Sequence, residues 1–165
     1  MPRIIGTGLR ALEFVFTVIL LGLVGSLEAN SSHNPESIHY SMFTAAFSML
    51  FLFYLIPATW SDSFTFHPIF PIVLDSLNVI FTFCAAVTLA ARTKGDSCSN
   101  HGFLNSNEIA LGSEHRCREA QAACAFFWFL WACYVGSLIS SIVGGRSSTN
   151  LHSSSSARRP GMSQV

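Results

Sequence analysis

The chain has 165 residues, of which 50% are hydrophobic, only 11% are charged and 15 are phenylalanine. This composition is too apolar for the surface of an ordinary soluble domain and is typical of a membrane protein. Nine lysines and arginines balance nine aspartates and glutamates, so the chain lacks the concentrated cationic face that nucleic-acid binding requires. The composition therefore favours a membrane protein and sets nucleic acid aside as a partner.

Four apolar stretches follow one another along the chain, at residues 9–27, 38–60, 69–91 and 120–143. Each is close to the ~20 residues with which a helix crosses a bilayer. None alternates with the period of two that a membrane barrel shows, and a helix satisfies every backbone amide within its own segment. The sequence predicts an all-α membrane protein built as a four-helix transmembrane bundle.

The first stretch has a competing interpretation as a secretory signal. Arginines precede it, and the small residues Gly25 and Ser26 close it. Its apolar run is longer than a typical signal core, however, and three more spans follow. We therefore interpret it as a retained first span.

The loops and the tail divide the chain into two parts. The connections at residues 28–37 and 61–68 are short, whereas the third loop, residues 92–119, has room for structure of its own. The last twenty residues are rich in serine and lack the apolar residues of a core. We predict a transmembrane domain at residues 1–145 and a disordered, serine-rich cytosolic tail at residues 146–165.

The basic residues near the membrane indicate the orientation. An even number of spans places both termini on one side, with five basic residues against four in the third loop: Arg3, Arg10, Arg146, Arg158 and Arg159 against Arg92, Lys94, Arg116 and Arg118. Cytosolic segments carry the excess of lysine and arginine. The count predicts cytosolic termini and an extracellular third loop.

Two of the five cysteines, Cys98 and Cys117, stand near the two ends of the third loop. They could remain free thiols or form a disulfide, and an oxidising outer face would favour the bond. We predict that they pair. The other cysteines lie within spans and are interpreted as small packing residues: Cys84, Cys124 and Cys133.

The third span carries polar residues at membrane depth, Asp75 and Asn78. Such groups mark either a proton or ion pathway or a packing contact. In the second case Asp75 would bond Asn78 or a group such as Glu13, whose own partner could be Arg10. We favour packing, because no further acids or histidines continue a path through the second and fourth spans.

Small and polar residues recur at every fourth position of the last two spans: Asn78, Thr82, Ala86 and Ala90 in the third, and Ala132, Gly136, Ser140 and Gly144 in the fourth. Such stripes let helix backbones approach closely in lipid. The spacing predicts that the third and fourth spans touch.

No catalytic constellation is visible. The six histidines are scattered without the spacing of a helical zinc pair, and no C-x-x-C, G-x-S-x-G or phosphate-binding glycine loop occurs. We therefore predict no metal, no cofactor and no enzymatic activity.

The third loop and the helix after it, "DSCSNHGFLNSNEIALGSEHRCREAQAACAFFWF", resemble the fungal non-classical export protein 2 family of tetraspan MARVEL-domain proteins. The shared features are an "SN.I..GS" centre, an "RCR.AQAA" close, "LDSLNVIFTF" in the third span and the terminal Ser163-Gln164-Val165. The resemblance covers essentially the whole chain. Cys98 and Cys117 take the positions of the family's loop cysteines, and Asp75 and Asn78 those of its third-span polar pair.

The resemblance implies a multi-pass plasma-membrane protein of furrow-like, eisosome-associated microdomains. Family members are linked to sphingolipid-responsive membrane organisation and to export outside the classical secretory route. The implied partners are sphingolipid- or sterol-rich membrane, further copies of the chain and other microdomain proteins. The alternative function is a small proton-coupled transporter or channel subunit that uses Asp75.

Overall fold

The computed structural model describes residues 2–30, 34–60, 69–94 and 97–155. Its elements are five helices: α1 (Pro2–Ala29), α2 (Glu36–Trp60), α3 (Ile69–Thr93), α4 (His101–Ser106) and α5 (Glu114–Ser155). The predicted tail beyond residue 155, with Arg158 and Arg159, lies outside the described residues.

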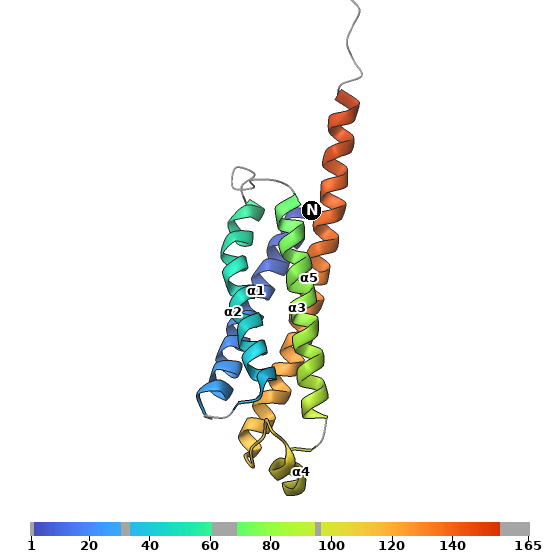
Figure 1. The fold of residues 1–165 in the computed structure, drawn as a ribbon. Helices are drawn as coiled ribbons and strands as arrows, with labels where there is room; N and C mark the ends of the chain where they lie inside the picture. The colour runs from blue at the N-terminus through green and yellow to red at the C-terminus, as the bar shows by residue number, and fades with distance from the viewer. Residues whose placement is uncertain (1, 31–33, 61–68, 95–96, 156–165) are drawn as a thin grey trace, which may run out of the picture.

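The four long helices form an up-and-down bundle, with the short α4 at the end where α3 leads into α5 (Figure 1). Four segments are long and apolar enough to cross a membrane: Ile5–Ala29, Glu36–Pro57, Ile69–Thr93 and Glu114–Val143. Large apolar side chains such as Leu50, Phe53 and Val143 point outward and are more than 60% exposed, which suits a bundle surrounded by lipid. The predicted four-helix transmembrane fold is confirmed.

The buried residues of each helix follow a spacing of alternately three and four residues. The spacing is clearest in α1 and α5. The buried positions of α1 are Arg10, Glu13, Thr17, Leu20, Val24 and Leu27, and those of α5, apart from the disulfide-bonded Cys117, are Arg116, Ala120, Ala123, Phe127, Leu130, Tyr134 and Ser137. A repeat of 3.5 residues keeps one face of a helix against its neighbours over many turns. Because of this repeat the helices stay in contact along their length.

α5 is longer at both ends than the predicted fourth span. It begins at Glu114 instead of residue 120, because Arg118 forms an ion pair with Glu114 one turn away (2.5 Å) and Arg116 is buried. It also continues through Ser155, whereas we predicted disorder from residue 146. Once a helix is established, each added residue gains a backbone hydrogen bond, so the helix can extend past its apolar segment.

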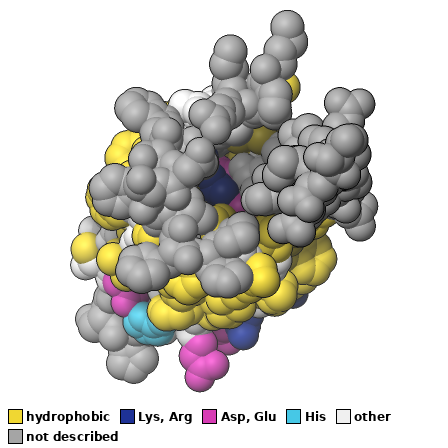
Figure 2. All heavy atoms as spheres, turned by 90° about the horizontal axis from the view of Figure 1, so that it is seen from above, with side chains coloured by type: hydrophobic (Ala, Val, Ile, Leu, Met, Phe, Trp, Pro, Cys, Tyr) yellow, Lys and Arg dark blue, Asp and Glu magenta, His cyan; other side chains and the backbone are white. Residues whose placement is uncertain are grey.

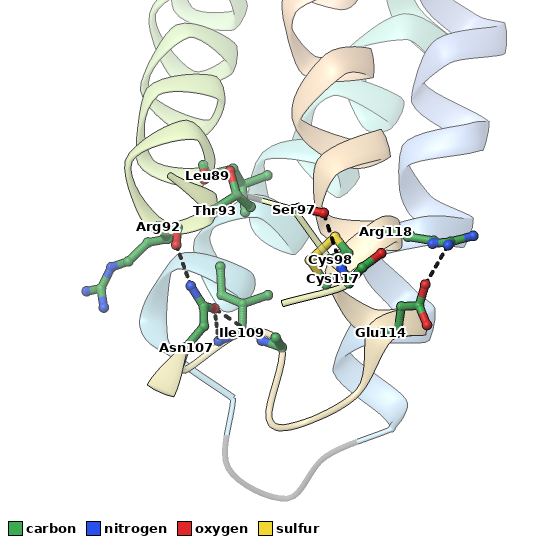
Figure 3. The surroundings of a disulfide bond; sticks show 12 residues. Leu89, Arg92, Thr93, Ser97, Cys98, Asn107, Ile109, Glu114, Cys117 and Arg118 are labelled. Atoms are coloured by element: carbon green, nitrogen blue, oxygen red, sulfur yellow. Dashed lines mark hydrogen bonds and ion pairs between the residues drawn. A yellow bond between two sulfur atoms is a disulfide. The ribbon is translucent and has the colours of Figure 1, made fainter. Parts of the chain in front are cut away.

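The loop between α3 and α5 forms a small cap that a disulfide closes (Figure 3). Cys98 and Cys117 are bonded, as predicted, and pack with Leu104 and Ala110. Asn107 fastens the loop to α3 by donating to the Arg92 carbonyl (2.8 Å), and its side-chain oxygen accepts from the next turn of the loop. The cap is therefore tied to both helices that it joins.

Arg116 joins the cap to the end of α1, which lies at the same end of the bundle (Figure 1). It is only 5% exposed and donates to the carbonyls of Ile109 (3.0 Å) and Leu27 (2.9 Å) and to Asn34 Oδ1 (3.0 Å). Leu27 lies in the last turn of α1, whose carbonyls lack partners within the helix. One guanidinium thus connects α1, the α1–α2 connection and the cap.

Replacing Arg116 with leucine is expected to destabilise the protein by about 2 kcal/mol, because buried carbonyls lose charged donors. Unfolding in mixed detergent micelles, followed by far-UV circular dichroism, measures the loss. Hydrogen exchange should rise in residues 97–113 first. The exposed Arg118 provides the matched control, and equal stability of the Arg116→Leu and Arg118→Leu variants would contradict the assignment.

Candidate functional site

Charged and polar side chains from three helices meet around Arg10. Its guanidinium holds the Asp75 carboxylate of α3 with both ends, at 2.7 Å from Nη1 to Oδ1 and 2.6 Å from Nη2 to Oδ2. Arg10 is 4% exposed and Asp75 is fully buried. A two-pronged contact of this kind is the strongest form of side-chain ion pair, and its planar geometry fixes α1 against α3.

Glu13 joins the same guanidinium from one turn further along α1. Arg10 Nη1 donates to Glu13 Oε2 at 2.9 Å, and Ser137 of α5 donates to Glu13 Oε1 at 2.5 Å. Glu13 is fully buried and Ser137 is 3% exposed. We call these four residues, Arg10, Glu13, Asp75 and Ser137, the ionic cluster. It links α1, α3 and α5.

A neighbouring pair of polar residues connects the remaining helix. Ser48 of α2 donates to Asn78 Oδ1 (3.0 Å), and Asn78 Nδ2 donates to the Leu74 carbonyl (3.0 Å). Asn78 and Ser48 are both fully buried. Side-chain hydrogen bonds therefore reach all four spanning helices.

The ionic cluster lies close to one end of the bundle. Arg10 and Asp75 stand five and six residues inside their spans, which begin at Ile5 and Ile69, or about 8–9 Å along a helix axis at 1.5 Å per residue. Seen from this end, basic and acidic side chains are visible near the centre of the bundle (Figure 2). The charges are therefore nearer an interface than the middle of the bilayer, where they would be most costly.

The cluster sets two carboxylates against one guanidinium. Removing one member of a buried ion pair leaves the other as an uncompensated buried charge. A complete cluster, in contrast, can fix how the helices are arranged. Within the described residues no three histidine, cysteine, aspartate or glutamate side chains are grouped to hold a metal ion. The chemistry that the cluster offers is hydrogen bonding and charge pairing between helices.

The partner of Asp75 is a polar group on a neighbouring helix, but neither of the two residues that we named. We expected Asn78 or a group such as Glu13, and the group is Arg10, while the Asn78 side chain bonds Ser48 and its own helix. The suggested contact between Arg10 and Glu13 is present. The spacing of three and four residues from Arg10 to Leu27 is the sequence signal that places Arg10 on the buried seam.

The predicted small-residue stripes divide between two interfaces. α3 and α5 share an extensive interface, and in it Cys124 of α5 donates its thiol to the Ala86 carbonyl (3.7 Å). Gly136 faces α1 instead, because a Cβ atom there would lie 3.5 Å from Leu9 Cδ1.

The other stripe residues contribute less to the contact between α3 and α5. Ala90 and Ser140 are half-buried, and Ser140 donates to the Gly136 carbonyl of its own helix (2.9 Å). Gly144 lies in α5, but its surroundings are outside the described residues. The third and fourth spans touch as predicted, and positions outside the stripes contribute to the contact, because the Phe83 ring of α3 meets those of Trp128 and Trp131 of α5.

The chain matches one protein family along most of its length. The membrane-associating domain called MARVEL matches residues 3–140. Non-classical export protein 102 of Candida albicans is 44% identical over 163 residues, which cover 95% of each chain. Non-classical export protein 2 of Saccharomyces cerevisiae is 33% identical over 164 residues, covering 95% of this chain and 91% of the relative.

A more distant relative extends the comparison. The non-classical export protein 2 homolog of Schizosaccharomyces pombe is 26% identical over 142 residues, or 85% of this chain and 78% of its own. No solved structure matches. The chain is therefore a multi-pass membrane protein with a MARVEL domain and belongs to the non-classical export protein 2 family.

Proposed function

We propose that the protein is a non-enzymatic organiser of plasma-membrane microdomains, of the furrow-like, eisosome-associated kind, and that it responds to sphingolipids. The observation that carries this proposal is the division of the bundle core. Among the described residues the buried carboxylates, Glu13 and Asp75, both lie toward one end, and beyond them the core combines an apolar cluster around Leu20, Leu89 and Phe127 with hydroxyl side chains and the Arg116 guanidinium. A core without further buried carboxylates or histidines offers no relay for protons, so it supports an organiser over a transporter.

The surface of the bundle supplies the means of organising membrane. Exposed apolar side chains cover the outward faces of all four spanning helices, and contacts with lipid or with further copies of the chain can form there. The names of the relatives refer to export outside the classical route. We infer that the protein aids such export by shaping the membrane around it, with sphingolipid- or sterol-rich lipid and other microdomain proteins as partners.

The proposed orientation has both termini in the cytosol. Arg10 is buried in the bundle and Arg116 in the cap. Without these two residues, the count of basic residues near the termini against those in the third loop changes from five against four to four against three. The excess still favours cytosolic termini. The Cys98–Cys117 disulfide then lies on the oxidising outer side, where such bonds persist.

Imaging tests the proposal. A tagged protein should colocalise with a marker of membrane furrows and redistribute when sphingolipid synthesis is blocked. Uniform distribution under both conditions would rule out the microdomain assignment.

The Asp75→Asn variant separates an organiser from a transporter. Arg10 and Glu13 remain as a neutral pair, and the amide oxygen of the new asparagine still accepts a hydrogen bond. We therefore expect a normal microdomain distribution and a free energy of unfolding within about 1 kcal/mol of that of the native protein. Colocalisation and unfolding in mixed micelles measure these effects. A variant that localises normally but loses all function would show that a titrating carboxylate is required, in favour of the transporter.

A further inference from the structure

A pocket opens between α2 and α3 at the end of the bundle opposite the ionic cluster. Its volume is about 310 Å³, and its walls are Glu36, Ser37 and Tyr40 of α2 and Thr88, Ala91 and Arg92 of α3. A second hollow of about 200 Å³ adjoins it at Ala91 and Arg92. α2 and α3 share the smallest of the main helix interfaces, so this is where the bundle is most open.

The two walls carry opposite charges. Glu36 stands in the first turn of α2, and within the described residues its carboxylate has no ion-pair partner. Arg92 stands in the last turn of α3, and its guanidinium points away from the disulfide (Figure 3). Arg92 Nη1 donates to Glu108, which leaves further N–H donors of the same group for a ligand.

Ser37 adds an unused polar group to the pocket. It is 7% exposed, and its hydroxyl has no hydrogen-bond partner among the described residues. Buried hydroxyls are normally paired. The Ser37 hydroxyl oxygen is itself buried, so it reaches a ligand in the pocket only after its side chain turns, and the charges of Glu36 and Arg92 carry the assignment.

Aromatic side chains continue from the pocket toward the middle of the bundle. The Tyr40 hydroxyl donates to the Phe81 carbonyl at 3.4 Å. The Phe81 ring meets those of Phe43 and Phe47 at centroid distances of 6.1 and 5.1 Å, and Phe43 is 52% exposed. A polar pocket at the end of two spans thus adjoins an apolar surface that lies deeper in the membrane.

We propose that this pocket binds the headgroup of a zwitterionic phospholipid, with an acyl chain lying on the surface of Phe43, Phe47 and Phe81. Arg92 hydrogen-bonds the phosphate, as guanidinium groups do. Glu36 and the Tyr40 ring receive the ammonium, through charge and through cation–π attraction. The site names a lipid partner for the proposed organiser and rests on that function.

The pair of opposite charges selects for the zwitterion. An anionic headgroup would meet the Glu36 carboxylate without a cation of its own to offset the repulsion. A sterol would leave unused the Arg92 N–H donors that Glu108 does not take. Phosphatidylcholine carries both charges on one headgroup and satisfies both walls.

Native mass spectrometry of the full-length protein tests the site. The protein is released from nanodiscs that hold equal amounts of phosphatidylcholine and phosphatidylglycerol with the same acyl chains. We expect it to retain phosphatidylcholine preferentially. Arg92→Gln should lower that retention about tenfold, as the loss of a charged hydrogen bond implies, and Glu36→Gln should shift the preference toward phosphatidylglycerol.

The exposed Arg118, which does not line the pocket, provides the control as Arg118→Gln. A photoreactive phosphatidylcholine with its reactive group near the phosphate should label peptides that contain residues 36–40 and 88–92. Preference for phosphatidylglycerol, equal retention by the Arg92 and Arg118 variants, or labelling elsewhere would each overturn the site.

Imaging separates this proposal from the function on which it rests. If the protein retains phosphatidylcholine in the pocket but does not gather in microdomains, the lipid site is supported and the organiser function is refuted. If the protein gathers in microdomains but shows no headgroup preference, the organiser function is supported and the lipid site is refuted.

Discussion

Replacing Arg10 with leucine is expected to lower the free energy of unfolding by about 3–5 kcal/mol, the usual cost of breaking a buried ion pair from one side. Asp75 loses its two-pronged partner, and Glu13 keeps only the hydrogen bond from Ser137. Two buried carboxylates then face each other without a compensating cation. Unfolding in mixed micelles, followed by circular dichroism, measures the loss, and cells should contain less of the variant.

Two further variants test the cause of that loss. Arg10→Lys keeps the charge but cannot hold both Asp75 oxygens in one plane, so its stability should fall between those of the native and leucine proteins. The triple variant Arg10→Met, Glu13→Leu, Asp75→Leu removes every charge together and should recover most of the stability, because a packed apolar core can replace a buried ion cluster. A triple variant as unstable as Arg10→Leu would show that lost packing, not stranded charge, explains the effect.

Removing the disulfide by Cys98→Ser and Cys117→Ser together should lower the free energy of unfolding by about 3 kcal/mol. The bond joins residues 19 positions apart, and closing a loop of this length restricts the unfolded chain by about that amount. Any change in the folded structure should be confined to the cap, so the four spans remain helical. Mixed-micelle unfolding with and without a reducing agent gives the measurement.

Reduction should destabilise the native protein by the same amount and leave the double-serine variant unchanged. Cys84 is a free, exposed cysteine of α3, and Cys84→Ser is the matched control that should retain native stability. Alkylation of both loop cysteines in freshly prepared membranes, before any reduction, would show that the bond is absent in the cell.

Hydropathy and spacing were enough to predict the main features of the fold. Four apolar segments near 20 residues must become helices in lipid, because each has to satisfy its own backbone. The third span begins at Ile69 as predicted. The pairing of Cys98 with Cys117 followed from their places at the ends of one loop.

The predicted site was only partly right. Asp75, Asn78 and Glu13 stood out because polar groups are rare at membrane depth, and all three are buried. Their partners could not be assigned, because a helical pattern shows which face is buried but not which residue of another helix lies opposite. Arg10 and Arg116 entered the sequence argument only as basic residues near the membrane, because the sequence does not show which buried acceptors they bond.

The sequence by itself determined how many helices cross the membrane and that each has a face suited to packing, since both depend on apolar content and on the 3.6-residue helical period. Only the tertiary structure decided that Arg10 bonds Asp75, that Gly136 faces Leu9 and that Arg116 donates to the Leu27 carbonyl. These contacts join residues from 65 to 127 positions apart in the chain. They depend on how each helix is rotated and shifted against its neighbours. Side chains from several segments of the chain determine that arrangement together.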